Sequence, residues 1–172
     1  MANNFWANSN LEPKRTNRWI VYMRDPFYSW IAKKVTRPAY TMSDVSHQWL
    51  NHKFNFPGRI TWNDVSIDIV DVGSTGNQVG GTLALYEMLL SAGYVYPTDE
   101  NQTSSISKQG AINALGQIKI HELDVNGNPL EEFTLYNSFA TTVQLGELTY
   151  DNEDIVTLSL TIKYDYAEYR LL

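Results

Sequence analysis

The sequence predicts a mainly β protein, built as a sandwich or barrel with one α-helix at its flank. Three observations support this class. Residues 154–166 are read as one long strand, because apolar and polar residues alternate from Val156 onward. Asn126-Gly127 separates two alternating runs, which is typical of a β-hairpin. Only residues 82–91 read clearly as a helix, and strands do not alternate with helices along the chain.

The composition bounds the fold and the kinds of partner. A chain of 172 residues with 43% hydrophobic residues can bury a core, so we expect one domain over residues 1–172. The absence of cysteine excludes disulfides and thiolate metal sites. The net charge of −6 argues against a nucleic-acid grip. Without a secretion signal or an apolar run of about 18 residues, we expect a soluble protein made in the cytosol, with no membrane insertion.

The first fifteen residues form an N-terminal arm. They are rich in asparagine, and Phe5 and Trp6 are their bulky aromatic residues. The composition allows two interpretations. The arm is either a frayed tail or a segment that docks both aromatic side chains on a neighbouring subunit.

The first half of the chain contains the predicted early strands. Residues 16–23 are β-branched and aromatic, which indicates the first strand. Residues 30–42 include Pro38, so any strand there is short or lies at a sheet edge. Residues 48–56 and 60–72 both alternate, and we expect them to form the arms of one long hairpin with Pro57-Gly58 as its tight link.

The predicted helix at residues 82–91 begins with Thr82 as its cap and ends before Gly93. Glu87 is its single charged residue. Because a surface helix normally has a polar half, we expect this helix to be covered on more than one side. Its own sheet is one cover, and a second subunit is the natural candidate for the other. A short helix over residues 107–115, closed by Gly116, is also indicated.

The second half of the chain is predicted to be mostly strand. Residues 118–123 and 130–136 flank the Asn-Gly turn, and residues 142–145 form a further short strand. In the final strand, one face is dry and the other is wet. The wet face consists of Thr157, Ser159, Thr161, Lys163 and Asp165.

No pattern in the sequence indicates chemistry. The three histidines lack zinc-ligand spacing, and the glycine-rich residues 73–81 lack the lysine of a phosphate-binding loop. Asp124, Asn126 and Asn128 start like a calcium loop, but Pro129 and a missing glutamate break the motif. Asp151, Glu153 and Asp154 fit a turn. We therefore predict that the protein is no enzyme and has no catalytic, cofactor or metal site.

Five segments, in this order, resemble the tail tube proteins of contractile-tailed bacteriophages. The likeness covers residues 16 to 169, nearly the whole chain. The segments are Asn17-Arg-Trp-Ile-Val-Tyr, residues 53–71 (Lys-Phe-Asn-Phe-Pro-Gly through Ile-Val-Asp), Leu135-Tyr-Asn-Ser-Phe-Ala, Gly146-Glu-Leu-Thr-Tyr and Lys163-Tyr-Asp-Tyr-Ala.

This resemblance implies two packed antiparallel sheets with a flanking helix. It also implies a hexameric ring with a shared inner β-barrel, and rings that stack into the tube of a virion tail assembled in the host cytoplasm. Sheath, baseplate and tail-terminator proteins are the implied partners, and genome DNA passes through the lumen. The N-terminal arm, residues 37–51 and the long hairpin would carry ring-to-ring contacts. The expected inter-subunit residues are Phe5, Trp6, Arg37, Trp49, Tyr86 and Leu90.

The wet face of the final strand is the candidate lumen surface. If its apolar face packs on its own domain, the five polar residues from Thr157 to Asp165 line the bore. A hydroxyl-rich and net acidic bore would let DNA slide without specific binding.

Two alternatives remain beside the tail tube. One is a baseplate tube initiator or the tube of an injection particle, which would share the fold. The other is a carbohydrate-binding β-sandwich module, suggested by five tryptophans and eleven tyrosines. Most of these aromatic residues fall inside the strand pattern, whereas a carbohydrate module exposes aromatic platforms in loops.

Overall fold

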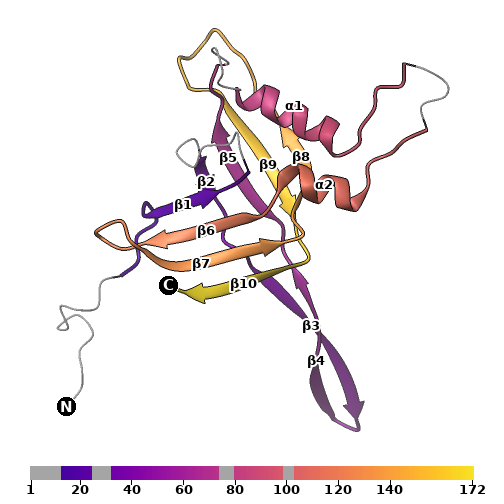
Figure 1. Ribbon diagram of the computed structural model, residues 1–172. Coiled ribbons are helices and arrows are strands. Elements are labelled where there is room, and N and C mark those ends of the chain that lie inside the picture. Colours follow the sequence, from indigo (N-terminus) through magenta and orange to yellow (C-terminus); the bar gives the residue numbers. More distant parts are fainter. Residues whose placement is uncertain (1–12, 25–31, 74–79, 99–102) are drawn as a thin grey trace.

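The computed structural model describes residues 13–24, 32–73, 80–98 and 103–172, which form ten strands and two α-helices (Figure 1). The mainly β class with flanking helix predicted from the sequence is confirmed. Phe5 and Trp6 lie outside the described residues.

Two four-stranded sheets make up the body, and every strand pair in them is antiparallel. Sheet A has the order β1 (Trp19–Tyr22), β6 (Ile118–Leu123), β7 (Pro129–Tyr136) and β10 (Tyr166–Leu171). Sheet B has the order β2 (Ala32–Val35), β5 (Val65–Val70), β9 (Thr157–Lys163) and β8 (Phe139–Gln144). A separate hairpin of β3 (Tyr40–Trp49) and β4 (His52–Trp62) projects from the body (Figure 1).

The core lies between the two sheets and the helices α1 (Gly81–Ser91) and α2 (Lys108–Leu115). Each fully buried aliphatic side chain contributes about 1.5–3 kcal/mol relative to exposure. One buried cluster therefore holds both sheets and both helices together. It includes Val21, Ile118, Ile120 and Leu135 of sheet A, Ile67, Ile69, Leu158, Leu160 and Ile162 of sheet B, and Ala84, Leu85 and Leu115 of the helices.

The C-terminal alternation is confirmed, but the prediction of one long strand is wrong. Leu158, Leu160 and Ile162 are buried on the dry face of β9. The chain leaves sheet B after Lys163, and β10 joins sheet A beside β7. At the break, the N–H of Asp165 donates to the carbonyl of Tyr136, 3.0 Å away in the other sheet.

The predicted link of the long hairpin is also wrong. The turn lies at Leu50, which has a φ of 50°, whereas Pro57 and Gly58 lie within β4. They occupy an irregularity in the register opposite Ser43. A Cβ on Gly58 would lie only 2.3 Å from the Ser43 hydroxyl oxygen, so glycine permits the close approach of the two strands. The Pro-Gly pair therefore forms a bulge.

The predicted helices are confirmed, with a different cap on α1. Thr82 lies inside the helix, and its N–H and hydroxyl donate to the carboxylate of Asp71 at 3.2 and 2.8 Å. Asp71, which follows β5, therefore caps the helix from outside. Ser107 caps α2 by accepting from the N–H of Gly110. The predicted edge strand is β2, and the predicted Asn-Gly hairpin is β6–β7.

Candidate assembly surfaces

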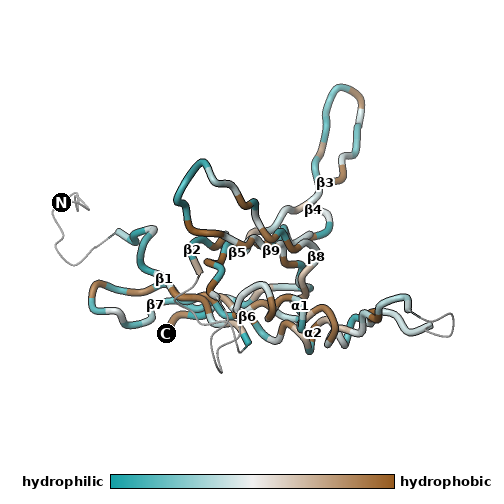
Figure 2. Tube along the Cα trace, turned by 90° about the horizontal axis from the view of Figure 1, so that it is seen from above, coloured by the Kyte–Doolittle hydropathy of each residue, from teal (hydrophilic) through white to brown (hydrophobic). Residues whose placement is uncertain are grey.

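Sheet B has two edges that pair with no further strand among the described residues. These edges are β2 and β8, at opposite ends of the sheet when the molecule is seen from above (Figure 2). An unpaired edge presents main-chain N–H and C=O groups to a partner strand. Because neighbouring strands alternate in direction across four strands, β2 of one copy would run antiparallel to β8 of another.

One face of sheet B is polar, and four of the five predicted lumen residues lie on it. The register places Thr157, Ser159, Thr161 and Lys163 on the face opposite the buried residues of β9. Neighbouring strands continue it, because Lys34 pairs with Asp68, Asp68 with Ser159 and Ser159 with Gln144. The Ser159 hydroxyl donates to Asp68 at 2.6 Å. We call this surface the polar face of sheet B.

Asp165 does not belong to the polar face. It lies in the turn after β9, where its carboxylate accepts from Lys108 at 2.8 Å and from Asn137 at 2.7 Å. The hydrogen bond from Lys108 and the one from Asn137 lower the pKa of Asp165. Without Asp165, the charged residues that the register places on the polar face are Lys34, Lys163 and Asp68, so these positions carry no acidic excess.

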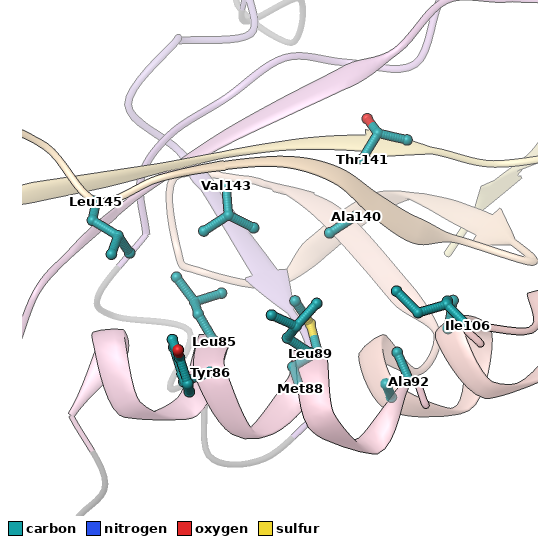
Figure 3. Close-up of a pocket in the computed structure, with 12 residues that line it drawn as sticks. Leu85, Tyr86, Met88, Leu89, Ala92, Ile106, Ala140, Thr141, Val143 and Leu145 are labelled. Carbon is teal, nitrogen blue, oxygen red and sulfur yellow. The ribbon is translucent and has the colours of Figure 1, made fainter. Parts of the chain in front are cut away.

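An apolar groove of about 380 Å³ lies between α1, α2 and β8 (Figure 3). Figure 3 shows Leu85 and Leu89 of α1 pointing toward Val143 of edge strand β8. Its other lining residues are also mostly apolar: Tyr86, Met88, Ala92, Ile106, Ala111, Ala114, Ala140, Thr141 and Leu145. We call this the α1–β8 groove. It adjoins the free edge of sheet B along its length.

The outer side of α1 is apolar and exposed. Tyr86 is 45% exposed and Leu90 is 41% exposed. The ring of Tyr86 stacks on Tyr96 with centroids 6.3 Å apart, and its hydrogen bond raises the pKa of Tyr96 to about 12. The residues that the structure describes therefore leave this outer side of α1 exposed.

The β3–β4 hairpin also carries exposed apolar side chains. Trp49 is 63% exposed and Leu50 is 87% exposed at its tip. An isolated two-stranded hairpin is at best marginally stable in water, so this element is expected to gain stability from a partner. Further exposed apolar residues on it are Tyr40, Met42, Val45, Phe54, Phe56 and Ile60.

Arg37, a predicted contact residue, is held by an ion pair within the chain. Its Nη1 lies 2.9 Å from Oε1 of Glu122. Lys14 lies 3.4 Å from the same carboxylate and also pairs with Glu131. The hydrogen bond from Lys14 lowers the pKa of the buried Glu131. The start of the described chain is thus fixed beside the segment that follows β2.

A buried carboxylate on sheet A was missed by the sequence reasoning. Glu132 is 7% exposed, and its carboxylate lies 2.8 Å from Nε2 of His121 and 3.3 Å from Nζ of Lys119. Burial alone would raise the pKa of Glu132, but hydrogen bonds from His121, Thr134 and Lys119 outweigh it and lower the pKa. Pairing across the Asn-Gly hairpin could have indicated this cluster, because the register sets His121 opposite Glu132.

Glu132→Gln is expected to make the free energy of unfolding less dependent on pH in the acidic range. Since the folded-state pKa of Glu132 is lowered from 4.5, its contribution is present above that value and is lost as the pH falls through the folded pKa. Urea unfolding at stepped pH should show a shallower fall in the free energy of unfolding below about pH 4.5. Glu147→Gln removes the same charge from an exposed loop and is the control. An unchanged slope in Glu132→Gln would show that the cluster does not couple to folding.

Among the described ranges, no group of three histidine, aspartate or glutamate side chains is placed to hold a metal ion. In the same part of the chain, neither helix is long and apolar enough to cross a membrane.

No protein-family model and no curated protein matches the sequence. Solved structures match the fold. A chain from the tube-terminating cap of the anti-feeding prophage is similar with a TM-score of 0.68 and 15% identity, covering 100% of both chains. A chain from the sheath/tube terminator of the extracellular contractile injection system PVC in its extended state has a TM-score of 0.67 and 14% identity, covering 93% of this chain and 98% of that one.

A third similar chain comes from the baseplate of the anti-feeding prophage, in a 6-fold symmetrised structure. Its TM-score is 0.65 at 10% identity, covering 93% of this chain and 97% of that one. At identities this low, the structural similarity shows a shared fold alone. The chain thus has the fold found in cap, terminator and baseplate structures of contractile injection systems.

Proposed function

We propose that the protein is a structural subunit of the inner tube of a contractile tail. Copies join head to tail through β2 and β8 into a hexameric ring with a shared inner β-barrel. Rings then stack into the tube. The observation that carries this proposal is sheet B, in which the edge strands β2 and β8 pair with no further strand of the described chain, one face is buried and the other is polar. The fold shared with contractile injection structures supports it.

Ring closure follows from the placement of the edges. A head-to-tail contact uses two different surfaces and gives a closed ring when its rotation completes a circle. Closure also removes both sticky edges. Six four-stranded sheets would give a barrel of about 24 strands, and barrels of 16–18 strands already leave an aqueous channel. The bore of such a ring is therefore open.

The polar face of sheet B would line the bore. Its opposite face is buried against sheet A and the helices, so only the polar face is available to a central channel. We assign Thr157, Ser159, Thr161 and Lys163 to the lumen and leave out Asp165, which pairs with Lys108. Hydroxyl groups with few charges would hold phosphates weakly. Genome DNA could then pass through a virion tail without specific binding.

The baseplate tube initiator and the injection-particle tube remain a second candidate role. It is favoured by the similar structures, which come from the anti-feeding prophage and an extracellular injection system. In either role, sheath, baseplate and terminator proteins would be the partners. The exposed β3–β4 hairpin with Trp49 and the segment around Arg37 are assigned to contacts between rings, and the N-terminal arm is assigned to a contact with another copy. Tyr86 and Leu90 are assigned to contacts with a neighbouring copy.

Microscopy of the purified protein tests this function. Negative-stain images and sedimentation over a range of concentrations are expected to show six-membered rings and, at higher concentration, hollow rods. A protein that stays monomeric at every concentration, alone and with sheath and baseplate proteins, would exclude it. Specific binding to a glycan array by that monomer would instead support the carbohydrate-binding alternative.

A further inference from the structure

The α1–β8 groove is an apolar surface that the described residues leave open. Ala140, Val143 and Leu145 line it, and the first two belong to edge strand β8. Any strand that pairs with β8 therefore brings its own flanking segments to the mouth of the groove. The groove is continuous with the interface through which copies are proposed to join, and the following inference rests on that proposed function.

The described chain begins on the side of the molecule opposite the groove (Figure 2). Lys14 is held by Glu122 and Glu131, and Arg37, just after β2, pairs with the same Glu122. The arm is thus anchored next to the β2 end of sheet B. Figure 2 shows this end of the chain on one side of the molecule, and α1, α2 and β8 on the other.

We propose that Phe5 and Trp6 of one copy fill the α1–β8 groove of the adjacent copy in the ring. When β2 of one subunit lies beside β8 of the next, the base of its arm lies next to that groove. Phe5 and Trp6 precede Pro13 by eight and seven residues, so an extended arm reaches roughly 25 Å.

The chemistry of the two surfaces matches. The arm carries two adjacent aromatic side chains in an asparagine-rich segment. The groove, at about 380 Å³, has the size of sites that take one or two such groups. Leu85, Met88 and Leu89 offer adaptable apolar walls, and the exposed ring of Tyr86 stands at the rim (Figure 3). A docked arm would cover Met88 and Leu89 of α1 where they face the groove.

Cross-linking tests the contact directly, because the natural chain has no cysteine. A Trp6→Cys subunit mixed with a Leu89→Cys subunit is expected to give a disulfide-linked heterodimer in isolated rings. The matched control replaces Leu89→Cys by Val125→Cys, which is exposed in the β6–β7 turn on the other sheet. A chain carrying both Trp6→Cys and Leu89→Cys should link between copies, and a link within one monomer would overturn the proposal.

Alanine substitution measures how much the arm contributes. Phe5→Ala with Trp6→Ala is expected to raise the concentration at which half the protein is in rings by about tenfold or more. Asn3→Ala with Asn4→Ala should leave that concentration unchanged. If rings form normally in the double aromatic variant and no cross-link to Leu89→Cys appears, the arm does not fill the groove, although the proposed tube function stands. If the natural chain forms no rings either alone or with sheath and baseplate proteins, both proposals fail together.

Discussion

Of the variants Thr142→Pro and Val143→Pro, one is expected to destabilise the folded monomer and the other to prevent assembly of a folded monomer. Along an edge strand, successive N–H groups point alternately to the paired strand and to solvent. Thr142 and Val143 are consecutive and in regular register with Thr161 and Leu160 of β9. In one of the two variants, proline therefore removes a hydrogen bond to β9 and destabilises the monomer by about 1–3 kcal/mol. In the other, which we call the outward variant, proline removes only an N–H that points away from β9 toward a neighbouring copy.

The outward variant is the informative one for the ring. Its monomer should unfold at the same urea concentration as the natural chain, yet it should fail to form rings at concentrations where the natural chain assembles. Leu148→Pro, in the exposed β8–β9 loop, controls for proline itself and should affect neither property. If both β8 variants keep natural stability and assemble normally, β8 does not join the subunits.

Leu160→Lys and Thr161→Lys should separate the two faces of β9. Leu160 is 1% exposed in the core, so lysine there loses about 2–5 kcal/mol of packing and buries an unpaired charge. Typical domains are stable by only about 5–15 kcal/mol, and this variant is expected to be largely unfolded. Thr161 is half-buried on the polar face, so lysine there should leave the chain folded.

Circular dichroism with urea titration checks folding of the two lysine variants, and DNA retention checks the bore. Tubes carrying Thr161→Lys should hold duplex DNA more tightly than natural tubes, with a binding constant that falls steeply as salt rises. Thr161→Ser is the control, because it keeps a hydroxyl at the same position. Folded Thr161→Lys tubes with unchanged DNA retention would place this face outside the bore.

The local elements were predictable because their signals lie within short stretches of sequence. Asn126-Gly127 identified the β6–β7 turn, where Gly127 has a φ of 84° that suits glycine. The helices were bounded by Gly93 and Gly116, which both adopt positive φ. The hairpin turn at Leu50 carried no such signal. Pro57-Gly58 was mistaken for a turn because a bulge, like a tight turn, favours glycine, which has no Cβ.

Of the candidate surfaces, the sequence identified residues but not their arrangement. Tyr86 and Leu90 were predicted from an apolar helix with one charge, and both are exposed on it. Thr157, Ser159 and Thr161 were assigned to one face, and the register places them there. Asp165 followed the same alternation, yet it lies in a turn beside Lys108. The sequence could not predict the α1–β8 groove, because its lining residues Leu85, Ile106 and Val143 come from three separate segments.

By itself, the sequence determined which side chains of each strand and helix seek the core, because burial leaves a period of two or 3.6 in neighbouring residues. Only the tertiary structure decided which strands pair, where β9 gives way to β10, and which edges of sheet B stay free. Those outcomes depend on contacts between residues far apart in sequence, such as the hydrogen bond from the N–H of Asp165 to the carbonyl of Tyr136. The periodicity of a segment does not indicate which other segment it pairs with.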